Sequence, residues 1–127
     1  MKLGDAFTLP NEYGVRHLHV VISDPAQSSD QVFHVMVSTR GDHKEECCIL
    51  RSNDHPFITH DSVIVYKIPP ARLVTLQKLN QLKEQNILKE KQPVSPELLK
   101  RIQEGYAKSH FLADRIYQLL FRQGLIE

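Results

Sequence analysis

Residues 62–82 read SVIVYKIPPARLVTLQKLNQL, and the periodicity of the sequence changes in the middle of them. Their first part is short, apolar and rich in β-branched residues, which is typical of a strand over residues 62–68. Beyond Pro69 and Pro70, leucines recur at positions 73, 76, 79 and 82, which predicts an amphipathic helix over residues 71–86. The stretch therefore divides the chain into a strand-rich part, residues 1–69, and a helical part, residues 70–127.

The part before residue 70 contains further short apolar segments that are separated by turn residues. These segments are residues 5–9, 17–23, 31–38 and 46–50. Turn signals recur about every 8–12 residues, a spacing typical of sandwiches and barrels. A parallel sheet would need helical crossovers of about a dozen residues or more, and none fits between these segments. We therefore predict an antiparallel sheet or small barrel, in a fold that is mainly β with C-terminal helices (α+β).

The part after residue 70 is predicted to hold two or three helices. Residues 95–97, Ser-Pro-Glu, combine an N-cap serine, a proline at the first helical position and an acidic first turn. Apolar residues then follow at helical spacing to residue 123, with Gly105 and Ser109 as candidate break points and Gly124 as a stop. Such stripes mostly pack on a sheet, but two amphipathic helices expose more apolar surface than a small sheet covers. We therefore expect a homodimer.

Composition places the chain among globular proteins. It has 127 residues, 41% of them hydrophobic and 24% charged, which suits a single domain, residues 1–127. The net charge of +1 excludes a polyanion-binding tail, although a local groove for single-stranded nucleic acid stays open. No apolar run approaches the roughly 20 residues of a membrane span, and the first residues lack the apolar core of a signal peptide. We expect a cytoplasmic protein without membrane partners.

Motifs for metals and cofactors are missing from the sequence. The seven histidines do not show the spacing typical of zinc sites, so we predict no metal. Cys47 and Cys48 are adjacent and would point to opposite faces of a strand, so we expect reduced thiols. Neither a glycine-rich phosphate loop nor GxSxG occurs, so we expect no cofactor. A histidine-based hydrolase or metal protein remains a minor alternative.

Two polar residues stand at neighbouring strand ends. Arg16 precedes the segment 17–23, and Thr39 directly follows the segment 31–38. In an antiparallel pair the start of one strand lies beside the end of the next, so Arg16 and Thr39 are expected to converge. A guanidinium and a hydroxyl together suit a phosphate group, although strand-end residues of these types are commonly just solvated.

The order of these motifs resembles that of the PemK/MazF family of toxin–antitoxin ribonucleases. The resemblance is carried by Leu-Gly-Asp at 3–5, the strand 14–23 with its leading Arg16, the strand 35–41 with Thr39, and the segments 57–65 and 72–73. It covers residues 3–80. The chain differs from the family in having His17 where a proline usually follows the arginine, and in a longer helical tail after residue 88.

The resemblance implies an SH3-like barrel and a metal-independent endoribonuclease that cleaves single-stranded RNA. In that family the 2′-hydroxyl of the RNA attacks the adjacent phosphate, and the catalytic arginine and threonine correspond to Arg16 and Thr39. A homodimer and a cognate antitoxin are implied as partners. The candidate RNA-binding residues are His17, Arg40, Lys44, His60 and Ser62. The alternative is a non-catalytic SH3-like module that binds RNA or protein.

Overall fold

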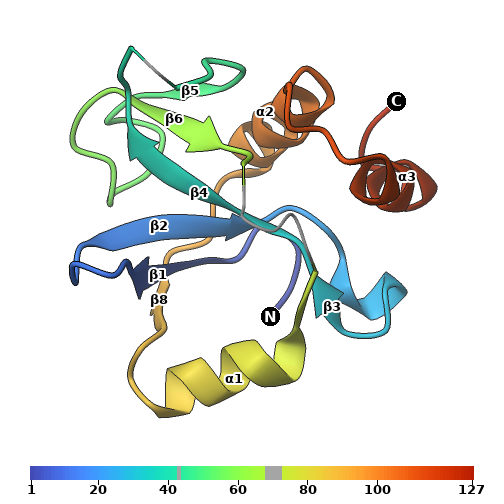
Figure 1. The fold of residues 1–127 in the computed structure, drawn as a ribbon, viewed down its shortest axis with the longest axis horizontal. Helices are drawn as coiled ribbons and strands as arrows, with labels where there is room; N and C mark the ends of the chain where they lie inside the picture. The colour runs from blue at the N-terminus through green and yellow to red at the C-terminus, as the bar shows by residue number, and fades with distance from the viewer. Residues whose placement is uncertain (43, 68–72) are drawn as a thin grey trace.

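The computed structural model describes residues 1–42, 44–67 and 73–127, and in these residues it shows a mixed α+β fold with three α-helices around a mostly antiparallel sheet (Figure 1). The strands of the main sheet, in spatial order, are β5 (Ile49–Leu50), β6 (Ser62–Val65), β4 (His34–Thr39), β2 (Arg16–Val21), β1 (Ala6–Pro10) and β8 (Lys89–Lys91). A second sheet pairs β3 (Gln31–Val32) with β7 (Val74–Thr75). The helices are α1 (Leu76–Glu84), α2 (Pro96–Ala107) and α3 (Asp114–Arg122).

The hairpin of β1 and β2 is closed by a turn that fixes the start of β2. The side chain of Asn11 accepts hydrogen bonds from the backbone N–H groups of Tyr13 and Val15, at 2.9 and 3.0 Å. Gly14 completes the turn with φ +78°, a conformation that residues with a Cβ rarely adopt. The resulting register places Arg16 opposite Pro10, directly beside the turn of the hairpin.

The central strands of the main sheet are buried on both faces, and alternation along each strand decides which side chain enters which hydrophobic cluster. From β2, Leu18 and Val20 enter the larger hydrophobic cluster, whereas Val21 belongs to a smaller one. Residues of α2 and α3 complete the larger cluster, and leucines of α1 complete the smaller one. Figure 1 accordingly shows α1 on one side of the sheet and α2 and α3 on the other.

Close packing of α2 against the strands depends on Gly105. A Cβ on this residue would lie 2.3 Å from the Tyr66 hydroxyl and 3.0 Å from the Cys47 carbonyl oxygen. The bare backbone lets the buried Tyr66 donate a 2.6 Å hydrogen bond to the Ile102 carbonyl inside the helix. Gly105 is therefore a packing position inside α2, and the predicted break between helices comes after Ala107 instead.

The helical part differs from its prediction in two respects. The first helix begins at Leu76, where Thr75 caps it by accepting a hydrogen bond from the Lys78 N–H, whereas a start near residue 71 was expected. Residues 71 and 72 lie outside the described residues. The strands β7 and β8 also follow residue 70, so the division into a strand part and a helix part is not strict. Ser95 caps α2 as predicted, with Pro96 at its first position.

The strand predictions hold in order, with shorter extents. The expected strand 31–38 is divided at Phe33 into β3 and β4, and the expected strand 46–50 is reduced to β5. The expected strand 62–68 ends at Val65, and its residue 68 lies outside the described residues. Among the described strands the pairing begins at β5 and ends at β8, and a closed barrel is not found in it.

Candidate functional site

A cavity of about 190 Å³ lies where the start of β2, the end of β4 and the loop before β6 meet. Thr39 pairs with Ser62 across the sheet, which brings the loop residues Thr59 and His60 beside the end of β4. The residues around the cavity are Val15, Arg16, His17, Leu18, Val37, Ser38, Thr39, Phe57, Ile58, Thr59, His60 and Ser62. Arg16, His17, Thr39, His60 and Ser62, which the sequence singled out, thus surround one space.

A hydrogen-bonded chain of side chains joins β4 to the loop. The Thr39 hydroxyl lies 2.9 Å from Nε2 of His60, and the other ring nitrogen of His60 lies 3.1 Å from the Thr59 hydroxyl. The buried Ser62 hydroxyl donates to the backbone carbonyl of His60 at 3.0 Å. Both nitrogens of His60 are therefore occupied by hydroxyl groups, which accept or donate according to the protonation of the ring.

His17 is oriented by a backbone group of the neighbouring strand. Its Nδ1 lies 3.2 Å from the carbonyl oxygen of Val37 in β4. Because a carbonyl oxygen only accepts, Nδ1 carries the proton in this bond, and in the neutral ring Nε2 keeps its lone pair. Among the described residues, no hydrogen bond to Nε2 of His17 is formed. This ring is thus held with one basic nitrogen unused.

Arg16 is partly occupied by structural contacts. Its Nε donates to the Thr8 hydroxyl at 2.9 Å, and Nη2 donates to the Thr8 carbonyl at 3.2 Å and to the Ile87 carbonyl. These bonds tie the start of β2 to β1 and to the turn that follows α1. Within the described part of the chain Nη1 has no hydrogen-bond partner.

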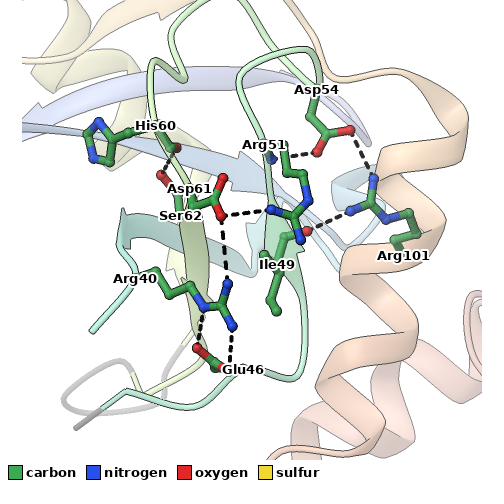
Figure 2. Close-up of polar contacts among 9 residues, drawn as sticks. All are labelled: Arg40, Glu46, Ile49, Arg51, Asp54, His60, Asp61, Ser62 and Arg101. Carbon is green, nitrogen blue, oxygen red and sulfur yellow. Dashed lines mark hydrogen bonds and ion pairs between the residues drawn. The ribbon is translucent and has the colours of Figure 1, made fainter. Parts of the chain in front are cut away.

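Arg40 and Lys44 line a second, more open depression of about 800 Å³, which shares Thr39 and His60 with the first cavity. Arg40 forms two hydrogen bonds to Glu46, at 2.5 and 3.2 Å, and lies 3.6 Å from Asp61 (Figure 2). The hydrogen bond and charge of Glu46 raise the pKa of Arg40, and the same hydrogen bond lowers the pKa of Glu46. Arg40 is therefore paired with these acids in the free protein, and its RNA contact stays a prediction.

Lys44 reaches back onto the end of β4. Its Nζ donates to the Thr39 carbonyl at 2.6 Å and to the Ser38 hydroxyl at 3.1 Å. The ammonium group of Lys44 has three N–H donors, and these two bonds use two of them. Lys44 also places a positive charge at the rim beside Thr39. Lys44 and Arg40 therefore stand at the entrance of the site, outside the residues around the smaller cavity.

The loop that carries His60 is anchored by groups that sequence reasoning missed. The buried His55 lies 2.6 Å from the Gln92 carbonyl through Nε2, and its Nδ1 accepts the Phe57 N–H at 3.1 Å. Arg101 of α2 forms an ion pair with Asp54 at 3.0 Å and donates to the Ile49 carbonyl at 2.6 Å (Figure 2). These partners are distant in sequence, so no local sequence pattern predicts the contacts between them.

Two further histidines form a largely buried pair outside the cavity. Nδ1 of His19 lies 3.1 Å from Nδ1 of His34, and both rings pack on Phe7, which belongs to the smaller hydrophobic cluster. Burial, with lesser contributions from the neighbouring histidines, lowers the pKa of His19 to about 3. Burial also lowers the pKa of His34 to about 4. Both rings are therefore neutral in the folded protein at neutral pH.

The described residues contain no group of three or more histidine, cysteine, aspartate or glutamate side chains that could hold a metal ion. In the same part of the chain, none of the helices has the length and apolar character that crossing a membrane requires. Comparison with protein-family models, with curated proteins and with solved structures finds no match. The functional assignment therefore rests on the residues around the cavity.

Proposed function

We propose that this protein is a metal-independent endoribonuclease that cleaves single-stranded RNA, with an SH3-like barrel of the PemK/MazF type. One observation carries the proposal. Arg16 and Thr39, which stand at the ends of two different strands, line the same cavity, and His17, His60 and Ser62 line it with them. A guanidinium, hydroxyl groups and imidazoles around one small space are what a phosphodiester requires.

In the proposed reaction, the 2′-hydroxyl of a ribose attacks the adjacent phosphorus and displaces the 5′-oxygen of the next nucleotide. Negative charge develops on the phosphate oxygens, and Nη1 of Arg16 faces that charge. Arg16 is held in place beforehand by Thr8 and Ile87, so little reorganisation is needed in the transition state. The Thr39 hydroxyl contacts a phosphate oxygen, and Lys44 adds positive charge at the rim.

Single-stranded RNA fits the surroundings of the cavity. In this proposal the cavity of about 190 Å³ holds the phosphodiester, and the bases lie outside it. Phe57 lines the cavity and is 39% exposed, and Tyr13 at the tip of the β1–β2 hairpin is 83% exposed. Unpaired bases stack on such aromatic side chains at roughly 1–3 kcal/mol per base.

A homodimer and a proteinaceous antitoxin complete the proposal. Exposed aromatic side chains remain at the C-terminal end of the chain, where Phe121 is 53% and Phe111 is 41% exposed. Contiguous apolar surface is commonly covered by a partner protein, and the proposal assigns these side chains to such a surface. An antitoxin that covers the cavity would hold the enzyme inactive.

The test is an assay of single-stranded RNA cleavage by the purified protein in the presence of EDTA. We expect fragments that end in a 2′,3′-cyclic phosphate and begin with a 5′-hydroxyl. Cleavage that EDTA abolishes would contradict the proposal, as would RNA that remains intact under all conditions.

A second candidate function is a module that binds RNA without cutting it. The contacts of Arg16 with Thr8 and Ile87 favour it, because an arginine with this many structural partners also has a purely structural explanation. RNA that binds in a gel-shift assay but stays intact would support this function over the nuclease.

A further inference from the structure

We infer that His17 is the general base of the site and that His60 supplies, through Thr39, the proton of the general acid. The inference rests on the proposed ribonuclease function and assigns the proton transfers within it. Displacement of an alkoxide by a hydroxyl group needs one proton removed from the attacking oxygen and one delivered to the leaving oxygen.

The side chains around the cavity limit which residues can serve as the general base and the general acid. An arginine remains protonated throughout and a threonine hydroxyl is a weak acid, so Arg16 and Thr39 alone do not supply a base. Histidine is the side chain that exchanges a proton between about pH 5 and 8. Among the residues around the cavity, His17 and His60 are the two of this type.

The hydrogen bonds of the two imidazole rings suit His17 to accept a proton and His60 to supply one. His17 donates from Nδ1 to the Val37 carbonyl, so its Nε2 lone pair is the basic atom that remains. His60 contacts the Thr39 hydroxyl through Nε2 and the Thr59 hydroxyl through Nδ1. When His60 is protonated, both of its ring N–H groups donate, and the hydroxyl oxygens of Thr39 and Thr59 accept. The hydroxyl hydrogen of Thr39 is then directed to a different acceptor.

Long-range contacts hold the loop that brings His60 to Thr39. His55 fastens this loop to the Gln92 carbonyl, and the Asp54–Arg101 ion pair fastens it to α2. The Asp54 side chain is 17% exposed, whereas that of Arg101 is 46% exposed, so solvent screens this pair in part. The distance between His60 and Thr39 is thus set by the fold, as preorganised catalysis requires.

In the proposed step two protons move while one bond to phosphorus forms and another breaks. Nε2 of His17 takes the proton of the 2′-hydroxyl while the new O2′–P bond forms. The P–O5′ bond breaks, the Thr39 hydroxyl gives its proton to O5′, and Nε2 of His60 returns a proton to Thr39. The products are a 2′,3′-cyclic phosphate and a 5′-hydroxyl, with His17 protonated and His60 neutral. Exchange with water restores both rings.

The first experiment measures single-turnover cleavage against pH, on an oligoribonucleotide whose cut site has been mapped with the wild type. We expect a bell-shaped profile for the wild type. His17→Asn loses the acidic limb and His60→Gln the alkaline limb, each with a fall of about 10²–10⁴-fold in rate. The control His110→Gln changes an exposed histidine away from the cavity and keeps the wild-type profile.

The second experiment separates the acid from a merely structural role. A bridging sulfur replaces O5′ at the mapped cut site, because a thiolate leaves without protonation. We expect His60→Gln to cut this substrate within about tenfold of the wild type, whereas His17→Asn stays at least about 10²-fold slower. Thermal melts of both variants accompany the assay.

The outcomes distinguish the inference from the function on which it rests. A wild type that cuts RNA with a rate that rises steadily with pH overturns the inference and leaves the nuclease in place. The same holds if the sulfur substrate fails to rescue His60→Gln, or if both histidine variants cut normally. A wild type that does not cut RNA overturns the proposed function together with the inference.

Discussion

Acidification should destabilise this protein through the largely buried pair His19 and His34. The folded protein holds the pKa of His19 at about 3 and that of His34 at about 4, whereas an unfolded chain has values of about 6.5. The charged forms are therefore favoured by unfolding. Stability is complete above about pH 6.5 and is lost as the pH falls towards 4, because the unfolded state then binds more protons.

The magnitude follows from these differences. Each histidine costs about 1.4 kcal/mol per pH unit below 6.5, so at about pH 5 each costs about 2 kcal/mol and the pair about 4 kcal/mol. A domain of this size is stable by about 5–15 kcal/mol, so the loss is a large fraction of the total. Most carboxylates are still ionised at about pH 5, which keeps their contribution small in this window.

Urea denaturation at about pH 7.5 and at about pH 5 measures the effect as a change in the free energy of unfolding. The matched variant His34→Phe removes one titrating ring from an apolar position beside Phe7, and the pH-dependent loss should fall to about half. His110→Gln, at an exposed position, should leave the loss unchanged. A loss below about 1 kcal/mol in the wild type, or a full loss in His34→Phe, would refute the reasoning.

Three further predictions concern packing, the loop and assembly. Gly105→Ala should lower the free energy of unfolding by about 1–3 kcal/mol in urea denaturation, because its Cβ would meet the Tyr66 hydroxyl at 2.3 Å. An unchanged or higher stability would contradict the packing role. Arg101→Leu should slow RNA cleavage, because the loop of His60 loses its ion pair with Asp54, and single-turnover rates at equal folded fraction check this. A wild-type rate would show that α2 does not position the loop. Light scattering should give the mass of a dimer at micromolar concentration, and a stable monomer there would contradict the homodimer.

The central strands were predictable because their patterns are local. Alternation in β2 and the turn residues before it indicate both the strand and the position of Arg16 at its start. β8 gave no such signal, since Lys89–Lys91 is charged and exposed at every position. It becomes a strand through pairing with β1, a contact between distant parts of the chain. The start of α1 was placed too early because the leucine spacing extends back to Leu73, whereas the cap is Thr75.

The candidate site was predictable to the extent that it follows from strand pairing. Antiparallel neighbours bring Arg16 and Thr39 to one end of the sheet, and both line the cavity there. The loop with His60 was beyond such reasoning, because His55 and Asp54 hold it through Gln92 and Arg101.

Local sequence patterns also did not predict which charged residues pair with one another or which histidines are buried. The sequence did not reveal that Arg40 pairs with Glu46 and Asp61, because these contacts depend on the fold. The pair His19 and His34 depends on the pairing of β2 with β4, and its burial depends on packing that involves Phe7.

The most direct test of the central claim compares RNA cleavage in EDTA by the wild type, Arg16→Ala, Arg16→Lys and Thr39→Val. The account predicts that the wild type cuts and that Arg16→Ala is slower by a hundredfold or more, about 2.7–4 kcal/mol in activation free energy. Arg16→Lys should fail as well, because lysine cannot reproduce the planar guanidinium fork, and Thr39→Val should also be impaired. Thermal melts give the folded fraction to which each rate is normalised. Cleavage by Arg16→Ala as fast as that of the wild type, at equal folded fraction, would contradict the account.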